Sequence, residues 1–205
     1  MVEQTETGQY QLGPFALRLG LTRLRNQNAY RETIRRVPDL ADELGLMVAI
    51  SVWGLHGPTI VYIAESTARI HSNVAVGGTF MMTATATGKV FSAFLPLSTT
   101  EPLVRSRNSR ARSRRSIRYP PLTRAYRADV RDAAKVGYSI TRDAPIPGVS
   151  AIAAPVFDHT GTIQLAVTII GPTNYIDLSR DGATLERLIS FTKALSSDHG
   201  HIEDA

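Results

Sequence analysis

The sequence contains no cysteine, a single tryptophan and no long uninterrupted run of apolar residues. The absence of cysteine excludes disulfide bridges, thiolate zinc sites and cysteine nucleophiles. No stretch approaches the eighteen or so uncharged apolar residues that cross a bilayer, so no membrane partner is expected. The polar N-terminus, MVEQTETGQYQLG, lacks the basic and apolar blocks of a signal peptide. Together these absences favour a cytoplasmic protein.

Residue combinations that support catalysis or metal binding are equally scarce. The chain has no GxSxG elbow for a nucleophilic serine, and its five histidines are scattered. The two histidines of the C-terminal tail are separated by one glycine and belong to a segment expected to be solvated. Gly88 and Lys89 do not complete a phosphate-binding loop, because Thr83 replaces its first glycine and Val90 its magnesium-binding hydroxyl. The sequence therefore predicts no catalytic residue, no metal site and no cofactor.

Positive charge is concentrated in one segment. Residues 105–118, RSRNSRARSRRSIR, contain seven arginines and no acid, and without these charges the net charge falls from +5 to −2. A solvated loop, a contact with nucleic-acid phosphates, and a contact with an acidic partner or another subunit are all compatible with such a run. No aromatic residue interleaves the arginines, which weakens the case for stacking on bases.

The length and the apolar content of the chain are sufficient for one globular domain. The 205 residues are 43% hydrophobic and 20% charged, as in proteins with a substantial core. Apolar periodicity and turn residues predict an α+β fold, with helices packed on the faces of an antiparallel sheet. Five helices are expected: one that begins at Pro14, a second that ends at Gly45, a third within 77–96, a fourth at 122–136, and a last one after a cap at Ser179. The expected strands cover 46–53, 59–65, 68–76, 138–141, 149–157 and 162–170, and Gly171 and Pro172 are expected to end the last one.

Residues 77–96, GGTFMMTATATGKVFSAFLP, join a glycine turn to an apolar helix that ends at Pro96. Thr83 or Thr85 can cap this helix. The start of a helix offers free amides and a positive dipole end, which suit an anionic ligand. From the residues alone, a buried loop-to-helix junction that binds nothing is favoured, because helix starts far outnumber ligand sites.

Five segments follow one another in a distinctive order. They are GQYQLGPFALRLG, IRRVPDLADELG, GGTFMMTATATGK, AAKVGYSI and PGVSAIAAPVFDHTGTIQLAVTIIGP. In this order they resemble the C-terminal, effector-binding domain of the IclR family of bacterial transcription regulators, over roughly residues 8–197. The resemblance implies a GAF/PAS-like domain at 28–197, a lead-in and linker helix at 1–27, and a frayed tail at 198–205.

The resemblance also implies where an effector binds. In the family, the carboxylate of the effector meets amides at the start of the helix after the GG segment, which correspond to Ala86 and Thr87. Further pocket positions correspond to Thr141, Val149, Ala151, Thr168 and Ile170.

Several of these positions depart from the family. Relatives have an acid at Thr141, a cysteine at Ala151 and a serine at Ile170, and a Pro-Leu-His sequence where this chain has Met81, Met82 and Thr83. The last three residues are possible lining residues, and apolar side chains have replaced polar ones. We therefore expect a bulkier or aromatic carboxylate in preference to a minimal 2-oxo acid.

The family's winged helix-turn-helix precedes the linker helix, where this sequence has only seven residues. We therefore expect DNA to be read only by a domain outside this sequence, and the chain itself to sense ligand and to form a homodimer or a dimer of dimers. A stand-alone small-molecule binder or co-regulator is the main alternative. An enzyme on a GAF-like scaffold is a further one, although no catalytic residues support it.

Overall fold

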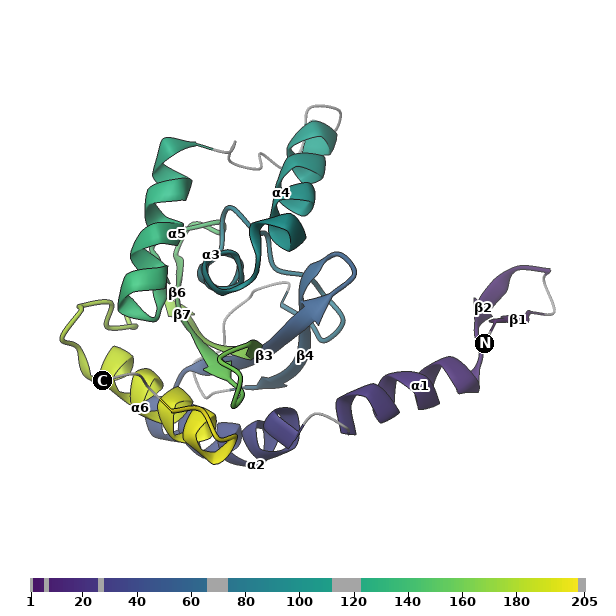
Figure 1. Ribbon diagram of the computed structural model, residues 1–205, viewed down its shortest axis with the longest axis horizontal. Helices are drawn as coiled ribbons and strands as arrows, with labels where there is room; N and C mark the ends of the chain where they lie inside the picture. The colour runs from purple at the N-terminus through teal and green to yellow at the C-terminus, as the bar shows by residue number, and fades with distance from the viewer. Residues whose placement is uncertain (1, 6–7, 26–27, 66–73, 112–122, 203–205) are drawn as a thin grey trace.

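A five-stranded antiparallel sheet forms the centre of the protein (Figure 1). The computed structural model describes residues 2–5, 8–25, 28–65, 74–111 and 123–202. The sheet order is β4-β3-β7-β6-β5, with β3 (Met47–Gly54), β4 (Gly57–Ala64), β5 (Ser139–Thr141), β6 (Val149–Phe157) and β7 (Ile163–Pro172). The helices are α1 (Pro14–Arg25), α2 (Asn28–Leu44), α3 (Ala86–Phe94), α4 (Leu97–Ala111), α5 (Arg124–Val136) and α6 (Ala183–Asp198). The predicted α+β class with an antiparallel sheet is confirmed.

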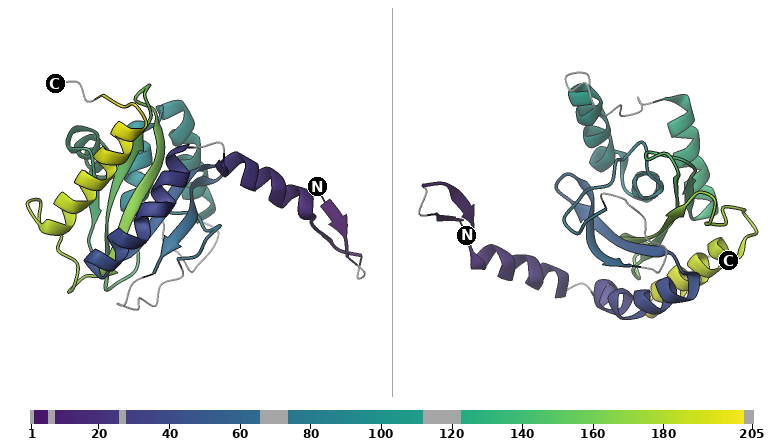
Figure 2. Two further views of the ribbon diagram at one scale, coloured as in Figure 1. Left: turned by 90° about the horizontal axis from the view of Figure 1, so that it is seen from below. Right: turned by 180° about the vertical axis from the view of Figure 1, so that it is seen from behind.

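The two faces of the sheet carry side chains of different size. Large aliphatic residues such as Ile50, Ile152 and Ile169 are fully buried on one face, in a core that α2 and α6 cover. These two helices lie side by side across that face (Figure 2). On the opposite face, the small residues Ala153 and Ala166 pack against α3, and larger residues such as Met47 and Ile170 lie elsewhere on this face. Since neighbouring side chains of a strand point to opposite faces, one alternating pattern produces both surfaces.

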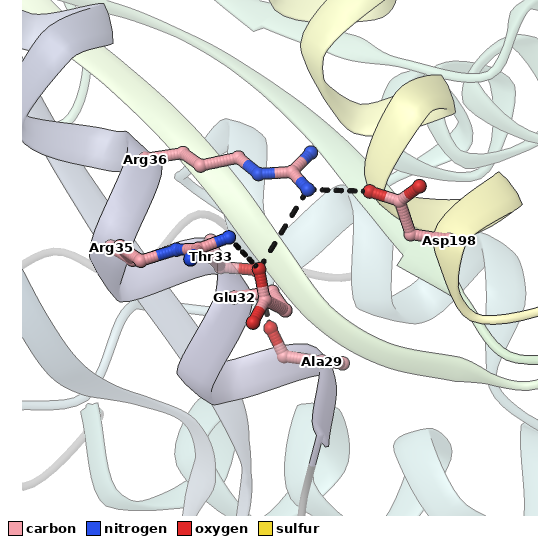
Figure 3. Close-up of polar contacts among 6 residues, drawn as sticks. All are labelled: Ala29, Glu32, Thr33, Arg35, Arg36 and Asp198. Atoms are coloured by element: carbon pink, nitrogen blue, oxygen red, sulfur yellow. Dashed lines mark hydrogen bonds and ion pairs between the residues drawn. The ribbon is translucent and has the colours of Figure 1, made fainter.

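Ion pairs at the surface join α2 to α6. Arg36 on α2 lies 2.7 Å from Asp198 on α6 and 3.7 Å from Glu32 on its own helix (Figure 3). At the other end of the pair, Arg187 on α6 contacts Glu43 on α2. The hydrogen bond that the guanidinium of Arg187 donates to the carboxylate of Glu43 lowers the pKa of Glu43. The pairs are exposed, so they orient the two helices while apolar burial supplies most of the stability.

The N-terminal residues form an arm that projects from the domain (Figures 1 and 2). The polar lead-in contains a small hairpin of β1 (Val2–Gln4) and β2 (Tyr10–Leu12), which the sequence did not predict. The arm then continues as α1. Its large apolar side chains are mostly exposed; they include Tyr10, Leu12, Phe15, Leu17, Leu19 and Leu21.

Helix α4 was not predicted, and it includes residues 105–111 of the arginine segment, for which a solvated loop was one of three open interpretations. It begins directly after Pro96, whose carbonyl accepts hydrogen bonds from the amides of Thr99 and Thr100. Val104 anchors the helix by packing beside Met82 and Tyr126. This anchor and local helical hydrogen bonds outweigh the effect of an internal proline at position 102. The side chains of 106–111 and all of 112–122 lie outside the described residues.

Two local predictions about strand and helix ends are wrong, and a third is tested only at its end. Strand β7 continues through Gly171 to Pro172, because the missing Cβ at Gly171 leaves room for Leu46. Helix α6 begins at Ala183 after a Gly182 cap, whereas the amide of Ser179 donates to the carboxylate of Asp177. Most of the strand predicted at 68–76 falls outside the described residues, and its described end, 74–76, is not a strand.

The described part of the C-terminal tail is held in place. The amide of His199 donates to the carbonyls of Leu195 and Ser196, and that of His201 also donates to Ser196. The ring of His201 lies 5.0 Å from that of Phe157. Fraying remains a prediction for 203–205, which lie outside the described residues.

Gly88 allows α3 to pack closely against the turn that precedes it. A Cβ at this position would lie 2.6 Å from the Cα of Met82 and would also overlap the carbonyl oxygen of Met81. We expect Gly88→Ala to lower the free energy of unfolding by about 1–3 kcal/mol, because backbone atoms must move. Urea unfolding followed by circular dichroism measures this change.

The matched control is Gly20→Ala, also inside a helix, where an added Cβ meets nothing within 4 Å. That change should raise stability by about 0.5–1 kcal/mol, because alanine is the better helix former. Equal effects of the two substitutions would show that close packing at Gly88 is unimportant.

Candidate functional site

Strand register places the predicted site residues of the sheet in neighbouring rows. Thr141 pairs with Ala151, Ala151 with Ile170, and Ile170 with Met47, which gives one row across four strands. The next row contains Thr168, opposite Ala153 and Ala49. Alternation along each strand turns these residues to the face that α3 covers. Residues far apart in sequence therefore meet on one surface.

The start of α3 meets this surface with a capped end. Thr85 is the N-cap, with extended φ and ψ of −113° and 152°, and its hydroxyl accepts a hydrogen bond of 3.0 Å from the amide of Gly88. The same hydroxyl donates to the carbonyl of Met81 at 2.8 Å. The amides of Ala86 and Thr87 have no hydrogen-bond partner among the described residues. The cap therefore leaves two helix-terminal donors available.

A cavity of about 590 Å³ lies between the helix start and the sheet. All seven residues predicted to bind the effector line it, namely Ala86, Thr87, Thr141, Val149, Ala151, Thr168 and Ile170, and so does Met81. Met82 points elsewhere and is buried beside Val104 and Tyr126. Thr83 is not among the lining residues. Met82 and Thr83 were expected as possible lining residues from the family resemblance alone. The turn before α3 instead directs Met82 toward α4 and α5.

The side-chain polar groups around the cavity are neutral threonine hydroxyls, which can donate as well as accept. The hydroxyls of Thr87 and Thr168 are hydrogen-bonded to each other at 2.8 Å, which leaves one of their two protons unused. The hydroxyl of Thr141 is buried and has no partner in the described part of the chain. The lining residues include no charged side chain. Acceptor atoms of a ligand would therefore find several donors here.

Comparison with known proteins assigns the domain. The sequence model described as "Bacterial transcriptional regulator IclR C-terminal" matches residues 22–197. The chain belongs to the IclR family. It is 29% identical over 205 residues to the glycerol operon regulatory protein of Streptomyces coelicolor, covering 97% of this chain and 78% of that protein.

Solved structures agree with this assignment. HmgR of Pseudomonas aeruginosa is 27% identical, with a TM-score of 0.75, and the match covers 99% of this chain and 80% of that one. The Thermotoga maritima IclR is 18% identical, with a TM-score of 0.74 and coverage of 98% and 80%, and supports the fold alone. The chain thus contains the C-terminal domain of an IclR-family transcriptional regulator.

A loop at the rim of the cavity was not predicted to contribute to this IclR site. Ala144, Pro145 and Ile146 are lining residues. The carboxylate of Asp143 holds the loop by accepting hydrogen bonds from the amide of Gly148 at 2.7 Å and the hydroxyl of Thr173 at 2.9 Å. The two prolines of this loop indicated a turn, but nothing in the sequence indicated which surface the turn would cover.

Other unpredicted lining residues come from β4 and the approach to α3. They are Ile60, Val74, Gly78, Thr79, Phe80 and Thr85. The amide of Ile60 donates to the carbonyl of Gly78, and that of Phe80 donates to Pro58, which holds this approach along the edge strand β4. A long-range pairing of this kind has no local sequence signal, so these residues could not be identified beforehand.

Helix α5 supports α3 from outside the cavity. Lys89, whose side chain is only 12% exposed, lies 2.7 Å from Asp129 on α5, which agrees with the rejection of a phosphate-loop role. The hydroxyl of Tyr126 hydrogen-bonds to that of Ser92 at 2.7 Å. Burial raises the pKa of Tyr126, so this phenol remains a neutral donor.

The described residues reveal no grouping of three His, Asp or Glu side chains that could hold a metal ion. Across the same ranges, every helix is too short or too polar to cross a bilayer. The cavity is therefore the best candidate for a ligand site in the described structure.

The free hydroxyl of Thr141 should lower the stability of the ligand-free domain. We expect Thr141→Val to raise the free energy of unfolding by about 1 kcal/mol, because it removes a buried polar group that has no partner. The control Thr168→Val has the same chemistry but breaks a formed hydrogen bond, and should lower stability by about 1–3 kcal/mol. Urea unfolding of both variants checks the prediction. An equal loss of unfolding free energy in the two variants would contradict it.

Proposed function

We propose that the cavity binds a small carboxylic acid with an apolar or aromatic body, and that this effector changes operator occupancy by the regulator. The observation that carries the proposal is the meeting, around one cavity, of all seven residues that the family resemblance implied. A ligand acts on such an equilibrium only when it prefers one state of the protein. The shape of a cavity between a helix and a sheet depends on how the helix lies on the sheet. A ligand in this cavity can therefore prefer one placement of the helix to another.

The donors support a carboxylate at the start of α3. The free amides of Ala86 and Thr87 belong to the positive end of a helix dipole, where anions are stabilised. The spare proton of the Thr87–Thr168 pair adds a third donor. A carboxylate brings acceptors only, so it complements a site that offers donors and no acid.

The remaining lining supports an apolar or aromatic body. Ile60, Phe80, Met81, Ile146 and Val149 present hydrocarbon or thioether surface to the cavity. The volume of about 590 Å³ lies within the roughly 300–1,000 Å³ typical of small-molecule sites. A two-carbon acid would leave most of this surface without a contact, whereas a ring attached to the carboxylate would cover it.

Removal of one helix-terminal amide tests the carboxylate position. Proline suits the first residue of a helix, and Thr85 already has the extended backbone that a following proline requires. We therefore expect Ala86→Pro to keep the fold and to weaken binding of an aromatic carboxylate such as phenylacetate by roughly 10–100-fold, the value of a hydrogen bond to a charged group. Isothermal titration calorimetry measures this loss.

Ala183→Pro is the control, since it makes the same change at the first residue of α6, away from the cavity. It should leave binding unchanged, and phenylacetamide should bind more weakly than phenylacetate to the unaltered chain. Tight binding of glyoxylate with no response to aromatic acids would contradict the proposed body. Binding that is indifferent to Ala86→Pro would contradict the proposed orientation.

We also propose that a second copy of the chain covers α1, giving a dimer or a dimer of dimers. Phe15 and Leu19 lie on one side of this helix and Leu17 and Leu21 on another, all between 44% and 66% exposed. Exposed leucines on more than one side of a projecting helix require more than one neighbour. A second arm related by two-fold symmetry would bury the same residues on both copies.

Light scattering should therefore give a mass of two or four chains. Leu17→Glu combined with Leu21→Glu should shift the protein to a smaller species, because buried charge would oppose association. Leu97→Glu, at a leucine that is 72% exposed on α4, serves as the control. A monomeric unaltered chain, or equal dissociation by both variants, would exclude pairing through α1.

A further inference from the structure

A stripe of basic residues follows the outer side of α5. It consists of Arg124, Arg127, Arg131 and Lys135, which are all exposed. Their spacing of three and four residues places them on one face of the helix. The buried residues Tyr126 and Ala133 occupy the opposite face, which packs toward α3. In Figure 1, α5 lies at the periphery of the domain, with its outer side away from the sheet.

None of the four cations has an ion pair or hydrogen-bonded carboxylate among the described residues. The acids of the same helix are engaged at its flank. Asp129 pairs with Lys89, and Asp132 pairs with Arg180 at 2.9 Å. The acids of α5 thus neutralise neighbouring elements and leave the outer stripe unbalanced.

We infer that this stripe binds the sugar-phosphate backbone of DNA without regard to sequence. Its positive charge is complementary to that of phosphate, and three of its four residues are arginines, whose planar guanidinium groups bind phosphate oxygens in pairs. From Arg124 to Lys135 the helix rises about 16 Å, over which one strand of a duplex carries about five phosphates. A transcriptional regulator acts where this polyanion is abundant.

The composition of the face argues against base recognition. The positions between the four cations on this side are occupied by short or apolar residues such as Ala128, and no exposed aromatic ring accompanies them. Phosphate contacts position a protein on DNA but carry no sequence information. The inference rests on α5 alone and does not depend on residues 106–122 or on the effector site.

The test removes three arginines at once. The variant Arg124→Gln, Arg127→Gln, Arg131→Gln retains good helix formers on an exposed face. Its binding to a fluorescein-labelled 30-base-pair duplex of scrambled sequence is followed by anisotropy between 50 and 200 mM NaCl. The plot of log K against log salt should lose about 2–3 units of slope relative to the unaltered chain, about one per phosphate contact.

The control variant Arg31→Gln, Arg35→Gln, Arg142→Gln removes the same charge from exposed arginines elsewhere. It should keep the slope of the unaltered chain, which separates contact by the stripe from the effect of net charge. Equal losses in both variants, an unchanged slope in both, or no duplex binding by the unaltered chain would overturn the inference. The inference would also be overturned, in favour of a membrane surface, by a different pair of results. In these, the unaltered chain sediments with phosphatidylglycerol vesicles and the stripe variant does not, while both bind the duplex equally.

Discussion

The size of the side chains beneath α3 determines how the rest of the domain is built. Ala153 and Ala166 lie where a larger residue would lift the helix from the sheet, and Gly88 removes the Cβ that would push it from the preceding turn. With α3 seated this closely, its first turn and the sheet together border the cavity. The opposite face has no such constraint, and its isoleucines and leucines pack to full burial under α2 and α6. One face thus supplies the stability and the other the binding site.

Enclosure of polar groups by this arrangement has an energetic cost that a ligand can recover. The amides at the start of α3 and the hydroxyl of Thr141 are removed from bulk water without gaining protein partners among the described residues. Unsatisfied polar groups of this kind destabilise a folded state. A ligand that provides acceptors restores the missing hydrogen bonds, and its binding free energy adds to the stability of the folded domain. The neutral donors also avoid the larger cost of an unpaired buried charge.

Much of this organisation could be predicted from the sequence, but unevenly. The apolar run at 149–157 and the turn that follows it predicted the bounds of β6 correctly. Gly137 marked the end of α5, because its backbone is left-handed, with φ of 83°, and glycine adopts that conformation most easily. The seven effector positions came from family resemblance and not from local chemistry. Strand register brings five of them together, and the start of α3 adds Ala86 and Thr87. Helix α4 and the pairing of 77–80 with β4 were missed, because each depends on tertiary contacts that outweigh local propensity. The cap expected at Ser179 is wrong for a local reason, since the carboxylate of Asp177 accepts hydrogen bonds from both the amide and the hydroxyl of Ser179.

Helix α3 contacts both the cavity and helix α5. Its first turn borders the cavity, while Lys89 and Ser92 on the following turns are bonded to Asp129 and Tyr126 of α5. These two contacts, an ion pair of 2.7 Å and a hydrogen bond of 2.7 Å, attach α5 to α3. Under the proposed function, a displacement of α3 on ligand binding would be transmitted to α5 through these two contacts, and so to the outer face of α5.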